Sequence, residues 1–368
     1  MTEYKQFTEK YRPKKFKDVV GQKVAVGTLE SMILKGTVNP TIMLSGPFGC
    51  GKTSLARIIA RYVNCSTKDA CGTCKSCLAM DSGTHTDVVE INAANARGID
   101  DMRALISASE FTPRSNYRVF ILDEIQNATP QSMQALLKPL EEPPKRTLWI
   151  LCTTDPQKIT PAIRSRAQQI KLQAVPVKSL VNLMSRVCEE EKLAFPEKAL
   201  EVLATMADGH PRNALMLLEQ VQHYLTSNGG MPENLEEVLP KIVEEIGSLP
   251  PELLVSKYIH SLLDANYRSC CNMVRKAENP EYFLHLSFKY IRNLLHEMAG
   301  VSSTPELASF LSQTAFKRSF TQEHLVKLLE LHLSGLEQAK RYFVDSCDVL
   351  DLVVLKSLEI MLTAPLRV

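Results

Sequence analysis

One eight-residue segment constrains the fold more than any other part of the chain: Gly46-Pro47-Phe48-Gly49-Cys50-Gly51-Lys52-Thr53, which has the pattern G-x-x-x-x-G-K-T. An apolar run precedes it at residues 42–44, and a helical pattern follows it at 54–62. A strand, a glycine-rich turn and a helix are the setting that a phosphate-binding loop requires. The glycines let backbone amides surround phosphate oxygens at a helix N-terminus. The segment, together with Ser54, therefore predicts a nucleotide site in which Lys52 reaches the β- and γ-phosphates and Thr53 binds Mg²⁺.

Four apolar runs predict β-strands in the first half of the chain, at residues 42–44, 87–91, 118–122 and 148–152. Helical patterns, such as the one at 131–140, lie between them. Strands that alternate with helices form parallel crossovers. Residues 1–175 are therefore predicted to form a doubly wound α/β domain, with the phosphate-binding loop at the carboxyl end of its strand, where such sheets bind ligands.

The strand pattern stops near residue 176. Helical patterns at 180–191, 197–207 and 211–225 predict a small three-helix lid, assigned to residues 176–243. A Gly-Gly pair at 229–230 and prolines at 233, 240, 250 and 251 predict a linker. Residues 244–368 are expected to be all-helical, with helices at 252–263, 266–276, 280–298 and 322–362. Their apolar faces suit a collar that joins subunits, although a self-contained bundle accounts for the same pattern.

Charge and composition narrow the function classes. Apolar residues make up 45% of the chain and charged residues 23%, which excludes a disordered protein. The net charge of +2 means that a nucleic-acid site would have to gather positive charge on one surface. The sequence shows no signal-peptide pattern and no apolar run of about 18 residues, so we expect no membrane span. Ten cysteines in such a chain suggest free thiols in a reducing cytoplasm.

Further residues are expected to complete the nucleotide site. Asp123 and Glu124 end an apolar strand, so Asp123 is expected to hold Mg²⁺ and Glu124 to deprotonate the attacking water. Thr154 ends the next strand, where its hydroxyl suits the γ-phosphate or the water, although a cap or turn is the plain alternative. Arg166 suits an arginine finger supplied by a neighbouring subunit, and Arg212, at the start of a lid helix, suits the γ-phosphate. An exposed arginine or a weak surface salt bridge is the alternative for each.

A cluster of four cysteines follows the phosphate-loop helix: Cys65, Cys71, Cys74 and Cys77, spaced C-x5-C-x2-C-x2-C. Four thiolates on a tight loop suit tetrahedral Zn²⁺ and leave no coordination position for water. The spacing therefore predicts a structural zinc site, with an iron–sulfur cluster as the competing interpretation.

Taken together, these motifs resemble the AAA+ clamp-loader ATPases of bacterial DNA polymerase III. The likeness covers about residues 8–225 and rests on the order and spacing of several stretches. These are Lys10-Tyr11-Arg12-Pro13, Phe16 to Gln22, the phosphate-binding loop, Asp123-Glu124, Ala135 to Pro144, Thr153 to Lys158, Ser165-Arg166 and Gly209 to Leu215. Two positions depart from the family pattern: Ala167 stands where Ser-Arg-Cys usually ends, and Gln126 where Asp-Glu-Val-His usually ends. The family also contains longer chains with a polymerase tether, so a short or virus-encoded form is one interpretation.

The resemblance assigns roles to individual residues. It implies that Tyr11, Arg12, Pro13 and Val20 form the adenine pocket, that Thr154 is sensor 1, and that Arg212 is sensor 2. It implies that Arg166 acts in trans and that a zinc module occupies the cysteine segment. Primer-template DNA is expected to meet basic side chains on helices, for which Arg103 and Lys138 are the candidates. A solvated helix face is the alternative for both.

The main functional hypothesis is therefore an ATP-driven motor subunit of a sliding-clamp loader, with ATP, Mg²⁺ and Zn²⁺ as cofactors. Its expected partners are other clamp-loader subunits in a pentamer, the sliding clamp, primer-template DNA and a replicative polymerase. Another AAA+ DNA remodeller, for branch migration or helicase loading, is the second hypothesis. A non-catalytic scaffold that binds ATP without turnover is the third, and a small-molecule kinase is a weaker fourth. The sequence leaves subunit stoichiometry, the identity of clamp and polymerase, and bacterial or viral origin open.

Overall fold

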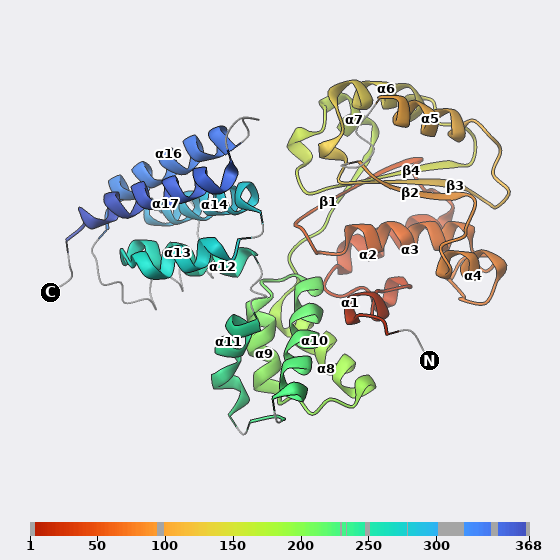
Figure 1. Ribbon diagram of the computed structural model, residues 1–368. Coiled ribbons are helices and arrows are strands. Elements are labelled where there is room, and N and C mark those ends of the chain that lie inside the picture. Colours follow the sequence, from red (N-terminus) through yellow and green to blue (C-terminus); the bar gives the residue numbers. More distant parts are fainter. Residues whose placement is uncertain are drawn as a thin grey trace. The chain divides into compact units, whose positions relative to one another are not determined.

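The protein is described from a computed structural model that covers residues 4–93, 99–228, 230–232, 234–246, 251–277, 279–300, 320–339 and 345–365. The chain forms two compact units, Met1–Leu239 and Pro240–Val368, which we call the sheet unit and the helical unit. Each is described by itself (Figure 1).

The sheet unit alternates strands and helices and then continues as helices alone. Its elements are α1 (Phe7–Lys10), η1 (Phe16–Asp18), α2 (Lys23–Lys35), β1 (Thr41–Ser45), α3 (Lys52–Asn64), α4 (Lys75–Asp81), β2 (Val88–Asn92), α5 (Ile99–Ser109), β3 (Arg118–Asp123), η2 (Ile125–Asn127), α6 (Pro130–Glu141), β4 (Thr147–Thr153), η3 (Pro156–Lys158), α7 (Pro161–Arg166), β5 (Gln168–Lys171), α8 (Val177–Glu191), α9 (Glu197–Met206) and α10 (Pro211–Ser227). The helix α11 (Leu235–Ile246) runs across the boundary between the two units.

All five strands of the sheet are parallel and lie in the order β2-β3-β4-β1-β5. The central strands are buried on both faces, as apolar runs in a parallel sheet require. Because β4 lies between β1 and β3, the end of β4 lies between the phosphate-binding loop and the Asp123-Glu124 pair. The expected doubly wound parallel sheet is confirmed.

Alternate residues of each strand point to opposite faces, so one sheet supports two cores. Helices α2 and α3 cover one face, where they pack on residues such as Ile42, Leu44 and Ile150. Helices α5, α6 and α7 cover the other face, where Met43, Phe120 and Trp149 are fully buried. The rings of Phe120 and Trp149 stack with centroids 4.5 Å apart. These two layers hold the strand ends, and therefore the loops that follow them, in fixed positions.

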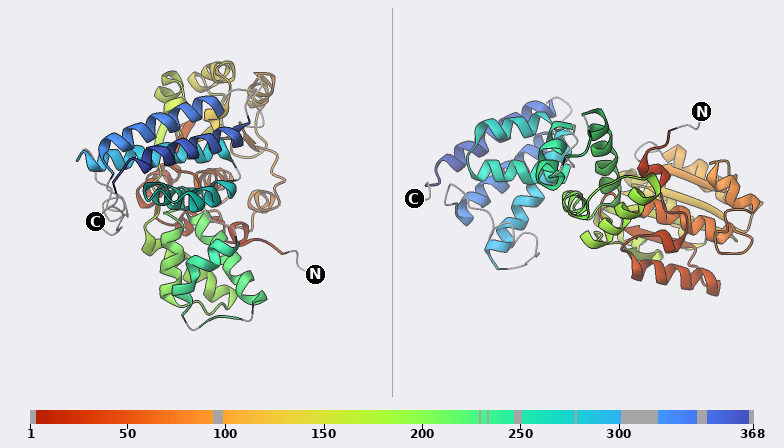
Figure 2. Two further views of the ribbon diagram at one scale, coloured as in Figure 1. Left: turned by 60° about the vertical axis from the view of Figure 1, so that its left-hand side comes forward. Right: turned by 90° about the horizontal axis from the view of Figure 1, so that it is seen from below.

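The helical unit contains no strand among its described residues. Its helices are α12 (Pro251–Leu263), α13 (Tyr267–Arg275), α14 (Pro280–Met298), α16 (Gln322–Ala339) and α17 (Ser346–Leu362). Helix α16 packs along both α14 and α17, which Figure 2 shows from two further sides. Within the described part of the chain, no helix combines the length and the apolarity that a membrane span needs.

Three sequence expectations are corrected by the structure. The edge strand β5 was not expected, because Gln168-Gln169-Ile170-Lys171 buries only Ile170 and carries no apolar pattern. The predicted linker contains the helix α11, which accommodates Pro240 in its interior. The single helix expected at 322–362 is two helices, because Asp345 caps a new N-terminus by accepting a hydrogen bond from the Cys347 amide at 2.8 Å.

Candidate functional site

A cavity of about 320 Å³ opens where β1 and β3 end. The sheet, the N-terminal segment and the lid helices α8 and α10 all contribute to its walls. Its lining includes Tyr11, Arg12, Pro13, Val20, Phe48, Gly49, Cys50, Gly51, Lys52, Thr53, Ser54, Asp123, Glu124 and Arg212 from the predicted site, together with Thr8, Asp18, Val19, Arg57, Glu90, Leu183, Pro211 and Leu215. Residues that are distant in sequence therefore meet around one cavity.

The loop between β1 and α3 has a conformation that depends on glycine. Gly51 is the N-cap of α3 and has a φ of 102°, which residues other than glycine rarely adopt. A Cβ atom on Gly46 would lie 2.6 Å from the backbone oxygen of Leu172, so the segment directly after β5 packs against this side of the loop. The buried Lys52 donates hydrogen bonds from Nζ to the carbonyl oxygens of Gly46 at 3.0 Å and Pro47 at 2.8 Å. The lysine is thus held inside the loop that would receive a phosphate.

The hydroxyl of Thr53 and the acids at the end of β3 are in direct contact. Thr53 Oγ1 donates a hydrogen bond to Asp123 Oδ2 at 2.8 Å, and the Glu124 amide donates to Asp123 Oδ1 at 3.1 Å. Glu124 has a φ of 50°, a left-handed conformation that costs on the order of 1 kcal/mol or more outside glycine. A hydroxyl beside a carboxylate is a suitable pair of Mg²⁺ ligands, because Mg²⁺ prefers oxygen.

Gln126 joins these acids to the end of β4, a contact that the sequence did not predict. Its Nε2 donates to Glu124 Oε2 and, at 2.9 Å, to Thr154 Oγ1. Its Oε1 accepts from Thr153 Oγ1 at 2.8 Å, and Thr154 Oγ1 donates to the same Glu124 oxygen at 3.3 Å. Thr154 does not line the cavity but contacts Glu124, which does.

Four cationic side chains gather around the cavity. Burial, and then the positive charge of Arg57, lower the pKa of Arg12, to which Arg212 contributes in the same direction. Arg57 forms two hydrogen bonds of 2.6 Å with the carboxylate of Glu90, and these bonds raise the pKa of Arg57. Together with Lys52, the arginines favour a polyanionic ligand. The sequence analysis did not predict Arg57 as a site residue. Its position, one helical turn after Thr53, places both residues on one face of α3.

The lid contacts the phosphate-binding loop and the N-terminal segment. The Arg212 guanidinium lies over the ring of Phe48, 5.7 Å from its centroid. The hydroxyl of Tyr11 donates to Glu191 Oε1 at 2.5 Å, which ties the N-terminal segment to the end of α8. Apolar side chains of Val20, Leu183 and Leu215 supply a surface on which a base can pack.

The cavity lining does not include Gly46, Pro47 and Thr154, nor the predicted residues Arg166, Arg103 and Lys138. Arg166 ends α7, where its guanidinium donates to the Ala162 carbonyl oxygen at 2.7 Å and forms an ion pair with Glu141 on α6. Arg103 on α5 is exposed and pairs with Asp100 at 3.5 Å, and Lys138 on α6 is exposed. Helices α5 and α6 pack against each other, so the two predicted DNA contacts share one layer of the sheet unit.

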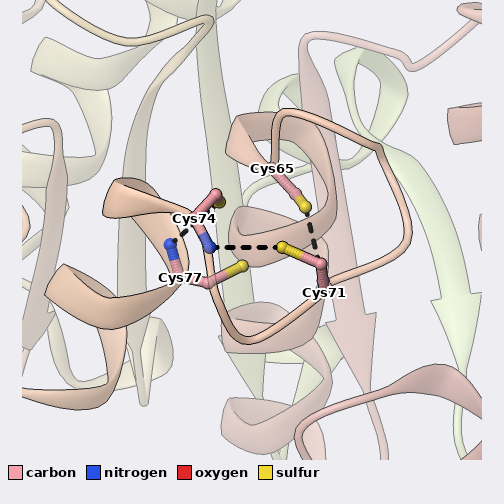
Figure 3. A group of neighbouring side chains, drawn as sticks. All are labelled: Cys65, Cys71, Cys74 and Cys77. Carbon is pink, nitrogen blue, oxygen red and sulfur yellow. Dashed lines mark hydrogen bonds between the residues drawn. The ribbon is translucent and has the colours of Figure 1, made fainter.

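The four cysteines converge on one point (Figure 3). Cys65 and Cys71 precede α4, Cys74 is its N-cap, and Cys77 lies within it. Their sulfur atoms all lie within 4.8 Å of one another, against about 3.8 Å for a tetrahedron with Zn–S bonds of ~2.3 Å. Backbone amides point at the sulfurs: the Cys71 amide donates to Cys65 Sγ at 3.4 Å, Cys74 to Cys71 at 3.4 Å and Cys77 to Cys74 at 3.5 Å. Amide donors stabilise thiolates, so this cluster fits a metal with four sulfur ligands and is consistent with zinc.

A charged network ties the cysteine module to the phosphate-loop helix. Asp81, at the end of α4, accepts a hydrogen bond of 2.5 Å from the buried Arg61 on α3 and pairs with Lys14 at 2.8 Å. The Arg61 side chain is 8% exposed, whereas Lys14 is 61% exposed. The module is therefore joined to the helix whose N-terminus forms the phosphate site.

Comparison with known proteins gives relatives over most of the chain. A family model described as DNA polymerase III, delta subunit, matches residues 21–176. The chain is 40% identical over 218 residues to DNA polymerase III subunit gamma/tau of Mycobacterium bovis, a match that covers 58% of this chain and 38% of that protein. It is 33% identical over 293 residues to DNA polymerase III subunit tau of Bacillus subtilis, covering 77% of this chain and 50% of that protein. The chain thus spans half or less of the length of these relatives.

Among solved structures, the fold is similar to that of the Thermotoga maritima RuvB Holliday junction branch migration motor. The TM-score is 0.52 at 22% sequence identity, and the match covers 69% of this chain and 80% of that chain. This likeness concerns the fold alone. It confirms the expected fold class, a parallel α/β domain followed by helical domains.

Proposed function

We propose that this chain, a DNA polymerase III gamma/tau-like subunit by its relatives, is an ATPase motor of a clamp loader that places a sliding clamp on primed DNA during replication. One observation carries the proposal: a single cavity combines the phosphate-binding loop with Asp123, Glu124 and Arg212. The loop and the acids at the end of β3 provide the groups that ATP hydrolysis needs. Arg212 on α10 connects the bound nucleotide to the lid.

ATP occupies the cavity with its phosphates on the loop amides. Lys52 exchanges its bonds to Gly46 and Pro47 for phosphate oxygens. Thr53 and Asp123 would hold Mg²⁺, which would supply positive charge next to the phosphates. Glu124 accepts a proton from the water that attacks the γ-phosphorus, the bond to the bridging oxygen breaks, and ADP and phosphate leave. Thr154 acts on this step through the oxygen of Glu124 that it contacts.

The active centre is completed by a second subunit. Arg166 pairs with Glu141 of its own chain and does not line its own cavity. In an assembly, Arg166 exchanges Glu141 for the γ-phosphate held by a neighbour, where a planar guanidinium stabilises the developing charge. An arginine finger of this kind contributes roughly 10³- to 10⁵-fold in rate.

The remaining elements serve assembly and DNA binding. Zn²⁺ bound by Cys65, Cys71, Cys74 and Cys77 has a structural role, because four thiolates leave no position for water. Arg103 and Lys138 contact the phosphates of primer-template DNA. The helical unit forms a collar that joins this chain to other clamp-loader subunits in a pentamer. The pentamer acts in the cytoplasm on the sliding clamp and together with a replicative polymerase.

The proposal is tested by ATP hydrolysis of the reconstituted assembly, with and without clamp and primed DNA. Clamp and DNA together should stimulate turnover, and Arg166→Ala should remove about 10³-fold or more of the stimulated rate. Stimulation that survives Arg166→Ala unchanged contradicts the shared active centre. Strand displacement by the purified assembly would instead favour a branch-migration or helicase-type motor, and ATP binding without turnover would favour a scaffold.

A further inference from the structure

The side chain of Gln126 forms hydrogen bonds with three residues near the cavity and has no part in the chemistry described so far. It lies in η2, directly after the Asp123-Glu124 pair, and does not itself line the cavity. Its amide group contacts Glu124, Thr153 and Thr154, so it spans the ends of β3 and β4.

The orientation of this amide follows from its neighbours. The ionised carboxylate of Glu124 can only accept hydrogen bonds, so the atom of Gln126 that faces it is the donor Nε2. The atom of Gln126 that faces Thr153 is then the acceptor Oε1, to which Thr153 Oγ1 donates at 2.8 Å, while Thr153 Oγ1 accepts from the Asp155 amide at 3.1 Å. Both hydrogens of Nε2 are then directed to Glu124 and Thr154, and every group in the network has a partner of the correct type.

The same network fixes one oxygen of the Glu124 carboxylate. Glu124 Oε2 accepts from Gln126 Nε2 and from Thr154 Oγ1, the latter at 3.3 Å. The backbone of Glu124 is in the left-handed region, with φ of 50° and ψ of 43°, a conformation that its surroundings must stabilise. A general base acts only within hydrogen-bond reach of the proton that it takes, so its orientation bears directly on the rate.

We propose that Gln126 is a positioning residue that sets the orientation of the Glu124 carboxylate for water activation and transmits the position of the β4 end to it. Gln126 acts on the chemical step and leaves nucleotide binding unchanged, because neither Gln126 nor its partners Thr153 and Thr154 line the cavity, and Gln126 reaches the lining only through Glu124. This inference rests on the proposed ATP hydrolysis, in which Glu124 is the general base.

The test compares full-length variants for binding of a fluorescent ATP analogue and for the kcat and KM of ATP hydrolysis. Gln126→Met keeps the shape of the side chain and removes its hydrogen bonds. It should lower kcat by roughly 10²-fold, the effect of about 1 Å of misplacement, with the dissociation constant of the analogue changed less than about two-fold. Gln126→His keeps an N–H donor and should recover part of the rate. Gln157→Met, an exposed glutamine on η3, is the matched control.

Thr153→Val gives an independent measurement, since Thr153 orients the amide and does not contact Glu124 in the bonds described. Thr153→Val should lower kcat by about tenfold, and the double variant should be no slower than Gln126→Met alone, because both act through one contact. Additive losses, an unchanged kcat in Gln126→Met, or an equal loss of analogue binding would overturn the inference. A wild-type assembly that binds ATP without turnover overturns the proposed function itself.

Discussion

The sheet unit and the helical unit differ in where they keep polar side chains. In the sheet unit, Thr53, Asp123, Glu124 and Gln126 stand where parallel strands and their loops end, and they contact one another. In the helical unit, His332 is completely buried between helices, where Nδ1 lies 2.8 Å from the Leu328 carbonyl oxygen. Strand ends gather polar groups around a cavity, whereas helix packing encloses His332 beside the buried Tyr258, whose hydroxyl lies 3.4 Å from His332 Nε2. Of these two arrangements, only the polar groups at the strand ends are placed to act on a ligand.

The largest effect that tests this comparison is expected from Glu124→Gln. Removing the general base should lower ATP turnover by roughly 10²- to 10⁴-fold. Unfolding of the sheet unit, followed by fluorescence of Trp149, the only tryptophan in the sequence, should change by less than about 0.5 kcal/mol.

The exposed Glu201 on α9 provides the matched control, since Glu201→Gln removes the same charge away from the cavity. Turnover within tenfold of wild type in Glu124→Gln would mean that the strand-end acids do not carry the chemistry. The distinction between the two units would then lose its functional basis.

The second test concerns the stability of the helical unit at acid pH. Burial lowers the pKa of His332 to about 4, from an ordinary value near ~6.5. Between these two pKa values, His332 is protonated in the unfolded chain and neutral in the folded chain. The free energy of unfolding therefore has its full value above pH ~6.5 and decreases as the pH falls toward 4. The loss should reach about 3 kcal/mol at the lower end.

Hydrogen exchange of α16 and α14 peptides, measured between pH 7 and pH 4, checks this expectation. His332→Gln removes the titrating group and should flatten the pH dependence of exchange. Equal acid sensitivity in His332→Gln would show that another group is responsible.

The third test weakens the link between the cysteine module and α3. Asp81→Asn removes the carboxylate that pairs with Arg61, whose side chain is 8% exposed. Loss of a charged hydrogen bond at a buried guanidinium should destabilise the sheet unit by about 2 kcal/mol. Lys14→Ala, at the exposed partner of the same carboxylate, should cost under about 1 kcal/mol. Denaturant midpoints followed by Trp149 fluorescence, together with the zinc content of each variant, measure both changes; equal losses for the two variants would contradict the role of burial.

The same contrast between strand ends and packed helices explains which elements could be predicted from the sequence. The phosphate-binding loop and the strand before Asp123 combine a fixed spacing with an apolar run, so both could be located from the residues alone. The edge strand β5 could not, because an edge position buries only Ile170 of its four residues. The break between α16 and α17 depends on the capping bond of Asp345, which an apolar pattern does not reveal.

Residues that act through other residues were the hardest to foresee. Arg57 and Glu90 come from α3 and β2, and only the fold brings their side chains together at 2.6 Å. Gln126 follows the Asp-Glu pair in sequence, but its contacts with Thr153 and Thr154 depend on β4 lying beside β3. Motifs therefore identified the residues that we propose contact phosphate, and the sheet order determines which residues support them.

The smallest effect is expected from Glu141→Gln, which releases Arg166 without removing it. The pair is a surface contact, with the two side chains 32% and 47% exposed, so its loss should cost under about 1 kcal/mol of stability. In the proposed shared active centre Arg166 leaves Glu141 to reach a neighbour, so weakening the pair by that amount should raise turnover of the assembly by at most about five-fold. Steady-state hydrolysis at saturating ATP measures the change, and the Arg166→Ala background provides the control, in which Glu141→Gln should have no effect. A rate increase that persists in that background would assign the effect to Glu141 itself, and the ion pair would then have no part in regulating the shared active centre.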